Sequence, residues 1–482
     1  MKPLSHRVTA LFLIVAVGLV LAALRSGGGG GPRVDGAAKP FLPAASLDLE
    51  AVRTLRIERS GRPPLVFERR GDGWVELLPS GLPVDPFLVR EAIEAATLLT
   101  SSRVLPIATL SGSAGADLFQ LGLDPPEAVV TISTPERDLV LRLGRVGVAG
   151  RAFVQPDGPE EDVFVVGQGL HGLVLGRDPR QWRLRLLMPE AGAETIRAGF
   201  EAGPTRVEIV RESGRWRLEQ PVRTRADRAA IESWLQSVAR AECDAFLEDI
   251  PNLDDAALGR FGLEPAVARL WVHNRAAPPA GSDRTLRIGA PVAVGGPDRF
   301  GWLEGHPSIM RLGAASLQSL FINPAALIEP TAVGAAAADV RSISFRTADC
   351  EFTIERSLDS WRCPQAGDAI ADTARVEELL ARLTTTRATA VLLQPPAPPT
   401  NAPTIVLRDF AGDVIATIAV GADRSRTQIT LDAGDGVARV FPAALEPATD
   451  PAAYGLSLTP RSEERNSAAP DRTQPQSPHA PP

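Results

Sequence analysis

The chain has 482 residues, of which 51 are basic and 58 acidic, a net charge of −7 and 44% hydrophobic residues. This balance excludes a wholly disordered chain and a protein that crosses a membrane many times. The net negative charge argues against general nucleic-acid binding, which needs a basic surface. Three cysteines exclude a disulfide scaffold and a cysteine-based zinc module. At roughly 100–200 residues per domain, the length predicts about three domains.

The first feature along the chain is an apolar run near the N-terminus. Residues 8–24 read VTALFLIVAVGLVLAAL, without a charge. As a helix this run covers about 26 Å, close to the roughly 30 Å of a bilayer core. Residues 1–7 are short and basic and should stay in the cytoplasm, while residues 25–50, which include five successive glycines, should form a flexible tether. We therefore expect a single-pass anchor in the inner (cytoplasmic) membrane, with the bulk of the chain extracytoplasmic.

The same run is open to a second interpretation, a cleaved signal peptide. Val20 and Ala22 are small enough to precede a cleavage site. The apolar run exceeds the 7–15 residues of a usual signal peptide, which favours the anchor. Cleavage would instead leave a secreted or periplasmic protein. Both interpretations place the residues beyond the tether outside the cytosol.

The rest of the chain contains an internal repeat. Three tryptophans lie in short strand-like runs that follow a turn: Trp74, Trp216 and Trp361. An aspartate follows each tryptophan after eleven positions: Asp85, Asp227 and Asp372. Apolar residues then occur four, seven, eight and eleven positions after each aspartate, which is one face of a helix. Aspartate is a preferred N-cap residue, so the pattern predicts three amphipathic helices, each beginning at its aspartate.

Alternating strands surround each predicted helix. Copies one and two share a GL-[DE]-P turn, at residues 121–125 and 261–265, which copy three lacks. Alternation indicates antiparallel sheets with one solvated face. The sequence thus predicts an α+β fold of three tandem repeats, each a mainly antiparallel sheet with one amphipathic helix. We place the repeats at residues 51–192, 193–333 and, as a degenerate copy, 334–457, and expect a disordered Pro-rich tail at 458–482.

These motifs resemble an uncharacterised bacterial family, a domain of unknown function, over roughly residues 50–455. The resemblance rests on the tryptophan strand, the aspartate-capped helix and the GL-[DE]-P turn followed by a strand ending in Leu-Gly. It implies a membrane-anchored extracytoplasmic repeat protein that accompanies ABC transporter subunits of the gliding-motility type. Copy three departs from the pattern because the GL-[DE]-P turn is missing.

Two motifs invite a chemical interpretation. Residues 167–172 read GQGLHG and match the glycine pattern of dinucleotide sites, but the preceding strands indicate a hairpin rather than a strand–helix–strand unit, which favours a glycine-rich turn. The histidines show no metal-ligand spacing, and we expect His171, His273 and His306 to be surface or loop residues. We name no catalytic, cofactor-binding or metal-binding residue and no cofactor.

The repeated aspartates and tryptophans have structural and functional interpretations. Capping explains the aspartates without a carboxylate site. The tryptophans fit core anchors, whereas a platform for stacking sugars would need them exposed. A disulfide between Cys350 and Cys363 stays open because geometry decides it, and Cys243 should be a buried apolar residue.

Two classes of function remain. The first is a non-enzymatic accessory or scaffold component of a transport or envelope complex, with the membrane and ABC transporter subunits or other envelope proteins as partners. The alternative is an envelope hydrolase acting on polysaccharide, whose dispersed acids a single sequence cannot reveal, because a carboxylate pair is recognised by its separation in space.

Overall fold

The computed structural model describes residues 39–40, 48–78, 80–110, 117–157, 161–251, 253–275, 283–395, 397, 399, 401–422 and 427–458. Within these ranges, no helix is long and apolar enough to cross a membrane. The expected cytoplasmic segment 1–7, the anchor at 8–24, nearly all of the tether and the tail after residue 458 lie outside the described residues.

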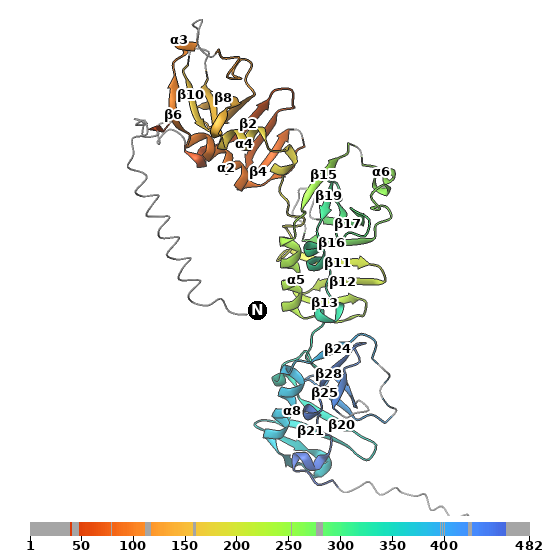
Figure 1. Ribbon diagram of the computed structural model, residues 1–482. Helices are drawn as coiled ribbons and strands as arrows, with labels where there is room; N and C mark the ends of the chain where they lie inside the picture. Colours follow the sequence, from red (N-terminus) through yellow and green to blue (C-terminus); the bar gives the residue numbers. More distant parts are fainter. Residues whose placement is uncertain are drawn as a thin grey trace, which may run out of the picture. The chain divides into compact units, whose positions relative to one another are not determined.

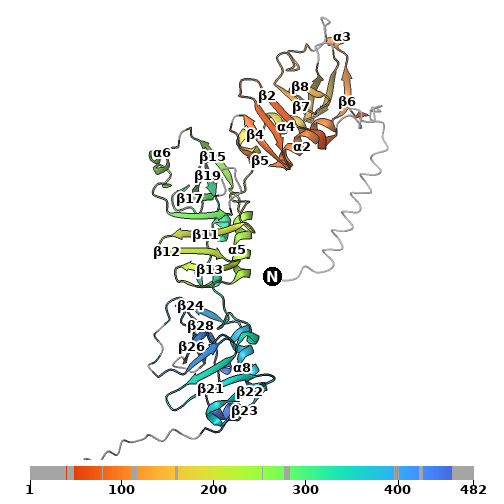
Figure 2. The same ribbon diagram turned by 180° about the vertical axis from the view of Figure 1, so that it is seen from behind.

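The fold is α+β, as predicted, with three antiparallel sheets in tandem along the chain. The first sheet has ten strands and the other two have nine each. Their strand orders are β1-β6-β10-β9-β8-β7-β2-β3-β4-β5, β14-β13-β12-β11-β16-β17-β18-β19-β15 and β23-β22-β21-β20-β25-β26-β27-β28-β24. In Figure 2 the strands β11, β12 and β13 can be followed side by side in the second sheet.

The first repeat contains strands β1 (Lys39–Pro40), β2 (Thr54–Arg59), β3 (Leu65–Arg70), β4 (Gly73–Leu78), β5 (Pro83–Val84), β6 (Thr100–Leu105), β7 (Ala128–Ser133), β8 (Asp138–Val146), β9 (Arg151–Pro156) and β10 (Val163–Gly167). Its helices are α2 (Pro86–Thr97), α3 (Ile107–Leu110) and α4 (Gly169–Leu175), with short 3₁₀ turns η1 (Leu49–Ala51), η2 (Val148–Gly150) and η3 (Pro179–Trp182).

The second repeat contains strands β11 (Thr195–Ala202), β12 (Thr205–Glu212), β13 (Arg215–Gln220), β14 (Thr224–Arg225), β15 (Ala245–Asp249), β16 (Ala268–Asn274), β17 (Asp283–Pro291), β18 (Arg299–Leu303) and β19 (Ser308–Leu312). Its helices are α5 (Arg228–Arg240), α6 (Asp255–Gly259) and α7 (Ala314–Leu320), and it closes with the 3₁₀ turn η4 (Pro324–Leu327).

The third repeat contains η5 (Ala337–Asp339) and strands β20 (Ser342–Arg346), β21 (Glu351–Ser357), β22 (Ser360–Cys363), β23 (Ala369–Ala371), β24 (Ala390–Leu392), β25 (Thr404–Arg408), β26 (Val414–Ala422), β27 (Gln428–Asp432) and β28 (Ala438–Pro442). Among its described residues there is one α-helix, α8 (Thr373–Thr385), together with the 3₁₀ turns η6 (Pro364–Ala366), η7 (Ala443–Leu445) and η8 (Pro451–Tyr454).

The three central helices begin where the sequence predicts. Each follows its aspartate directly, and each aspartate side chain accepts a hydrogen bond from a backbone N–H of the first turn. The four predicted offsets are the buried positions of each helix, for example Ile231, Trp234, Leu235 and Val238 in α5. Figure 1 shows α2, α5 and α8 beside the strands of their own sheets. The apolar face of each helix therefore packs in the core of its repeat.

Each repeat ends in a 3₁₀ turn, η3, η4 or η8, which we call its closing turn. This turn contacts the start of the central helix of the same repeat. The backbone N–H of each capping aspartate donates to the carbonyl of the last residue of η3, η4 or η8: Trp182 at 2.8 Å, Leu327 at 2.8 Å and Tyr454 at 2.9 Å. Each closing turn has an Asp or Asn cap followed by proline: Asp178, Asn323 and Asp450. This [DN]-P-x-x-apolar motif recurs three times and was not recognised in the sequence, where it stands at variable distances from the helices.

The GL-[DE]-P turn packs against a glycine in the second strand after it, β8 in the first repeat and β17 in the second. Gly122 and Gly262 adopt positive φ angles of 69° and 65°, which favour glycine. An added Cβ at Gly144 or Gly289 would collide with the carbonyl oxygen of Leu121 or Phe261, respectively. The absence of a side chain at Gly144 and Gly289 therefore allows a close approach of two backbone segments.

By its internal contacts the chain divides into two compact units. One contains the residues up to Leu184, and with them the first repeat. The other begins at Arg185 and contains the second and third repeats together.

Candidate functional site

The glycine motif at residues 167–172 links the end of strand β10 to helix α4. Strands β9 and β10 pair antiparallel immediately before it, so the hairpin expected from the sequence is confirmed. The helix that follows, α4, has only seven residues. A Cβ added at Gly167, Gly169 or Gly172 would meet nothing within 4 Å. These glycines are therefore not required for close packing, and the motif is a strand-to-helix turn.

One histidine was predicted wrongly. His171 is not a surface or loop residue: it lies in α4, is 1% exposed, and its Nε2 lies 3.2 Å from the carbonyl oxygen of Phe153. Burial lowers the pKa of His171 below its usual value, although backbone carbonyls of Phe153 and Gly144 oppose this shift. The ring is buried because α4 packs the side that carries His171 against the sheet. The spacing of the glycines in the sequence does not indicate which side of this helix is buried.

The other two histidines are partly exposed. His306 lies in the turn between β18 and β19, where its ring stacks on Phe246 at 5.4 Å between centroids and its Nδ1 accepts from the N–H of Ser308. His273 lies on β16, 3.0 Å from a carboxylate oxygen of Asp283. Among the described residues, no group of three His, Cys, Asp or Glu side chains is placed to hold a metal ion.

The repeated tryptophans are core residues. Trp74, Trp216 and Trp361 are 8%, 7% and 1% exposed, so none offers a face on which a sugar could stack. The capping interpretation of Asp85, Asp227 and Asp372 is confirmed by their hydrogen bonds to the first helical turns. The aspartates precede three different helices, and each helix belongs to a repeat with its own sheet. The three carboxylates therefore do not form one site.

The cysteines are free. Cys243 is buried, as predicted, and burial raises the pKa of its thiol to about 12. Cys350 and Cys363 do not form a disulfide. The hairpin register pairs Glu355 with Arg362, so Cys350 lies several residues from the position opposite Cys363.

An arginine that the sequence analysis overlooked recurs beside each tryptophan. The cross-strand partners of Trp74, Trp216 and Trp361 are Arg69, Arg211 and Arg356. Each arginine donates to a backbone carbonyl in the segment that leads into its repeat, namely Glu50, Ala193 or Ala337. The guanidinium of Arg356 also lies 4.5 Å from the ring centroid of Trp361. The constant five-residue spacing from arginine to tryptophan was the signal that could have revealed this pair.

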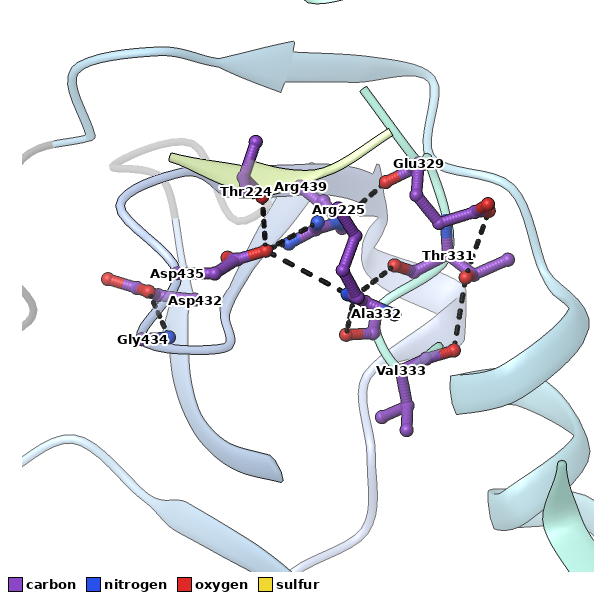
Figure 3. A network of polar contacts seen from close by, with 10 residues as sticks. All are labelled: Thr224, Arg225, Glu329, Thr331, Ala332, Val333, Asp432, Gly434, Asp435 and Arg439. Atoms are coloured by element: carbon purple, nitrogen blue, oxygen red, sulfur yellow. Dashed lines mark hydrogen bonds and ion pairs between the residues drawn. The ribbon is translucent and has the colours of Figure 1, made fainter. Parts of the chain in front are cut away.

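A network of hydrogen bonds and ion pairs lies where the second and third repeats meet (Figure 3). Arg439 of β28 is 0% exposed and donates from both terminal nitrogens to Asp435, at 3.0 and 2.8 Å. Its Nε donates to the carbonyl of Glu329. The hydroxyl of Thr224, in β14, donates to Asp435 at 2.6 Å. We call Thr224, Arg225, Asp435 and Arg439 the joint cluster.

Electrostatics keep the joint cluster charged. Burial alone would raise the pKa of Asp435, but hydrogen bonds from Arg439 and Thr224 and the charges of Arg439 and Arg225 hold it below its usual value. Arg225 donates to the carbonyls of Thr331 and Ala332, so it joins β14 to the segment between the repeats. Burial lowers the pKa of its guanidinium. The Asp435 carboxylate is therefore ionised at neutral pH, and both of its oxygens accept hydrogen bonds.

Two further contacts extend the joint cluster. Arg387, which follows α8, donates to Asp227 at 2.7 Å, so the cap of α5 also contacts the third repeat. Val437, between β27 and β28, is 0% exposed and packs in the hydrophobic core of the second repeat. Apolar packing and paired charges together hold the two repeats in one arrangement.

Two pockets among the described residues are small. One of about 200 Å³ lies beside α8 in the third repeat, and one of about 80 Å³ lies beside α2 in the first. Typical small-molecule sites enclose roughly 300–1,000 Å³, so neither has the size of a substrate cleft.

Comparison with known families bears out part of the resemblance. The model of a domain of unknown function, DUF4340, matches the chain twice, over residues 74–249 and 216–406. The matches begin at Trp74 and Trp216, so they report the same repeat that the tryptophans and caps reveal. No curated protein and no solved structure matches the chain. Because the two matches together cover more than half of the residues, the chain belongs to the DUF4340 family.

Proposed function

We propose that the chain is a membrane-anchored, extracytoplasmic, non-enzymatic scaffold that serves as an accessory component of a transport or envelope complex. The observation that carries this proposal is the joint cluster. A fully buried arginine is a costly group to place between two domains unless their arrangement is fixed. A binding surface that spans two repeats needs such a fixed arrangement, because rigid partners lose less freedom on association.

The location rests on the sequence. The uncharged run at residues 8–24 and the short basic flank before it support an anchor in the inner membrane with the repeats outside the cytosol. ABC transporter subunits are the partners that the family resemblance implies. Cleavage after the apolar run would give a periplasmic or secreted protein instead.

Affinity capture of the anchored protein tests the scaffold role. The tagged full chain would be cross-linked in intact bacteria, and co-purified membrane proteins identified. Thr224→Val together with Arg387→Gln should loosen the joint while leaving the buried Asp435–Arg439 ion pair intact, and should reduce the recovery of partners. Arg228→Gln, which removes an exposed ion pair with Glu232 on α5, is the matched control and should retain them. Equal recovery from all three proteins would contradict a role for the joint.

Reporter fusions test the location. Alkaline phosphatase fused after Pro43 should be active and a cytosolic reporter fused there inactive, because the tether lies outside the cytosol. A mature chain that begins near residue 1 supports the anchor, and one that begins near Ala23 supports cleavage.

A further inference from the structure

Bulky apolar residues are exposed at two turns of the third repeat. Leu358 lies in the turn between β21 and β22 and is 96% exposed. Phe410 lies in the turn between β25 and β26, Val414 is the first residue of β26, and they are 63% and 51% exposed. We call these three residues the apolar tips. Apolar residues exposed singly are common, but a group of them marks a contact surface.

The two turns project from the same end of the third sheet. Ser342, the first residue of β20, pairs with Glu355 of β21 on one side and with Arg408, the last residue of β25, on the other. Strand β20 thus lies between the two hairpins, in the order β22-β21-β20-β25-β26. Because neighbouring strands lie about 4.8 Å apart, the centres of the two hairpins are about 14 Å apart. The apolar tips therefore belong to one surface.

The geometry of the turn does not explain the leucine. Leu358 has a φ angle of 52°, in the left-handed region that bulky residues rarely adopt. Gly71 and Ser213 occupy the equivalent position in the other repeats, three residues before the repeated tryptophan, with φ angles of 60° and 49°. Leucine is thus unfavourable for the fold in its backbone conformation and in its exposure. Such a residue points to a role outside the fold.

Hydrogen bonds hold Phe410 in its exposed position. The Oδ1 atom of Asp409 accepts from the backbone N–H groups of Ala411 and Asp413, each at 2.9 Å. The guanidinium of Arg341 lies 6.0 Å from the ring centroid of Phe410. The turn is therefore ordered while the ring remains in contact with water. An ordered apolar side chain loses little conformational freedom when it becomes buried in a partner.

The surroundings of the apolar tips select the kind of occupant. A protein partner would need two recesses at the spacing of the hairpins, whereas a bilayer receives projecting side chains anywhere on its surface. Asp359, Asp413 and Arg408 are exposed beside the tips, so the surface carries both signs of charge. The headgroups of zwitterionic lipids offer an ammonium group and a phosphate group, which complement both signs.

We propose that the apolar tips insert into a zwitterionic lipid bilayer and give the third repeat a second attachment to the membrane. The inference rests on the proposed location, because the anchor at residues 8–24 would keep the third repeat within reach of the bilayer. A few buried side chains give weak, reversible membrane binding. Attachment elsewhere in the same chain raises the effective concentration and makes such weak binding sufficient.

Fluorescence from the tips tests the proposal. The full chain would be reconstituted in nanodiscs of phosphatidylethanolamine and phosphatidylcholine, with an environment-sensitive fluorescent amino acid in place of Leu358, Phe410 or Ser213. Emission from the first two positions should shift to the blue and be quenched by lipids that carry a nitroxide on the acyl chain. Ser213, in the equivalent turn of the second repeat, is the control and should show neither effect.

Substitutions separate insertion from an effect on folding. With the fluorescent amino acid in place of Val414, Leu358→Ser with Phe410→Ser should abolish the quenching by lipid. Leu358→Met with Phe410→Leu keeps both side chains apolar and should retain it. Melting temperatures should be similar for the two double variants, because the replaced side chains are exposed.

Each outcome supports or overturns the proposal. Unshifted and unquenched emission at Leu358 and Phe410 overturns it, and so does quenching that the serine variant retains. A blue shift without lipid quenching that needs more chain or an added protein assigns the tips to a second copy or to a protein partner. Failure of the chain to co-elute with nanodiscs contradicts the anchor instead, and vesicles of the same lipids added to the chain then decide the role of the tips.

Discussion

The carboxylate of Asp227 contacts two repeats at once. Its Oδ1 accepts from the N–H groups of Ala229 and Ala230 at the start of α5, and its Oδ2 accepts from Arg387 of the third repeat at 2.7 Å. Asp85 and Asp372 occupy the equivalent cap positions in the other repeats, where the hydrogen bonds described for their carboxylates are to their own helices. The same repeated residue thus has an additional role in the middle copy.

Substituting the caps should separate the two roles of Asp227. Asp372→Ala should cost about 0.5–2 kcal/mol, the usual effect of losing an N-cap. Asp227→Ala should cost more, because it also removes the partner of Arg387. Asp227→Asn retains a capping oxygen and should lose only the charge pairing. Denaturant unfolding of the three variants checks this order, and equal losses for Asp227→Ala and Asp372→Ala would show that Arg387 adds nothing.

Removing one partner of the buried Asp435–Arg439 ion pair should strongly lower the free energy of unfolding. Asp435→Ala leaves Arg439 buried without its anion, which typically costs about 3–5 kcal/mol. Asp435→Leu with Arg439→Met removes both charges and should recover most of that loss. Thermal unfolding of the single and double variants measures the difference. A double variant as unstable as Asp435→Ala would indicate that packing volume, rather than charge, controls the joint.

Acid should weaken the joint in a defined direction. The pKa of folded Asp435 lies below its ordinary value of 3.8. Its contribution to stability is therefore complete above about pH 4 and is lost as the pH falls through the folded pKa. Unfolding free energies measured between pH 7 and pH 2.5 should decline less steeply at the acid end for the Asp435→Leu, Arg439→Met variant.

His171 should make the first repeat sensitive at milder acidity. Its folded pKa is lowered, so the unfolded chain takes up a proton first as the pH falls below about 6.5. Above that pH the neutral ring contributes its full stabilisation to the folded repeat. This stabilisation is lost as the pH falls toward the pKa of His171 in the folded chain. His171→Gln should remove this dependence, which tryptophan fluorescence of unfolding between pH 8 and pH 5 would detect. Identical pH profiles would show that the ring titrates normally.

Two sets of glycines should respond oppositely to alanine. Gly289→Ala should destabilise the second repeat, because its Cβ would collide with the carbonyl oxygen of Phe261. Gly169→Ala and Gly172→Ala have open space and lie in α4, so each should be neutral or stabilise by up to about 1 kcal/mol. Melting temperatures check both, and a large loss at Gly169 or Gly172 would reopen the question of a ligand at this turn.

Much of the fold was predictable because its signals are local. A cap, four apolar offsets and a tryptophan strand lie within about two dozen residues, and helix periodicity makes them readable. The Arg356–Trp361 pair was equally local but was overlooked, because an arginine on a strand is usually a solvated residue.

The joint could not be predicted in the same way. Thr224 and Asp435 are separated by 211 residues and are brought together by packing of the second and third repeats. Burial of Arg439 follows from that contact, and its own strand contains no feature that distinguishes it. The pocket beside α8 was hidden for the same reason, since its walls come from residues 375–382 and 446–454, which are separated in the sequence.

The closing turn would have a consequence for export if the proposed extracytoplasmic location holds. The helix caps of all three repeats are completed by residues roughly 80 to 100 positions later, so these contacts have a high contact order. If the chain emerges across the membrane from its N-terminal end, α5 remains without its final backbone partner until Leu327 has passed. Each repeat would then be the shortest stretch of chain that can complete its fold outside the cytosol. A chain that stops before its closing turn would expose an incomplete core to periplasmic chaperones and proteases.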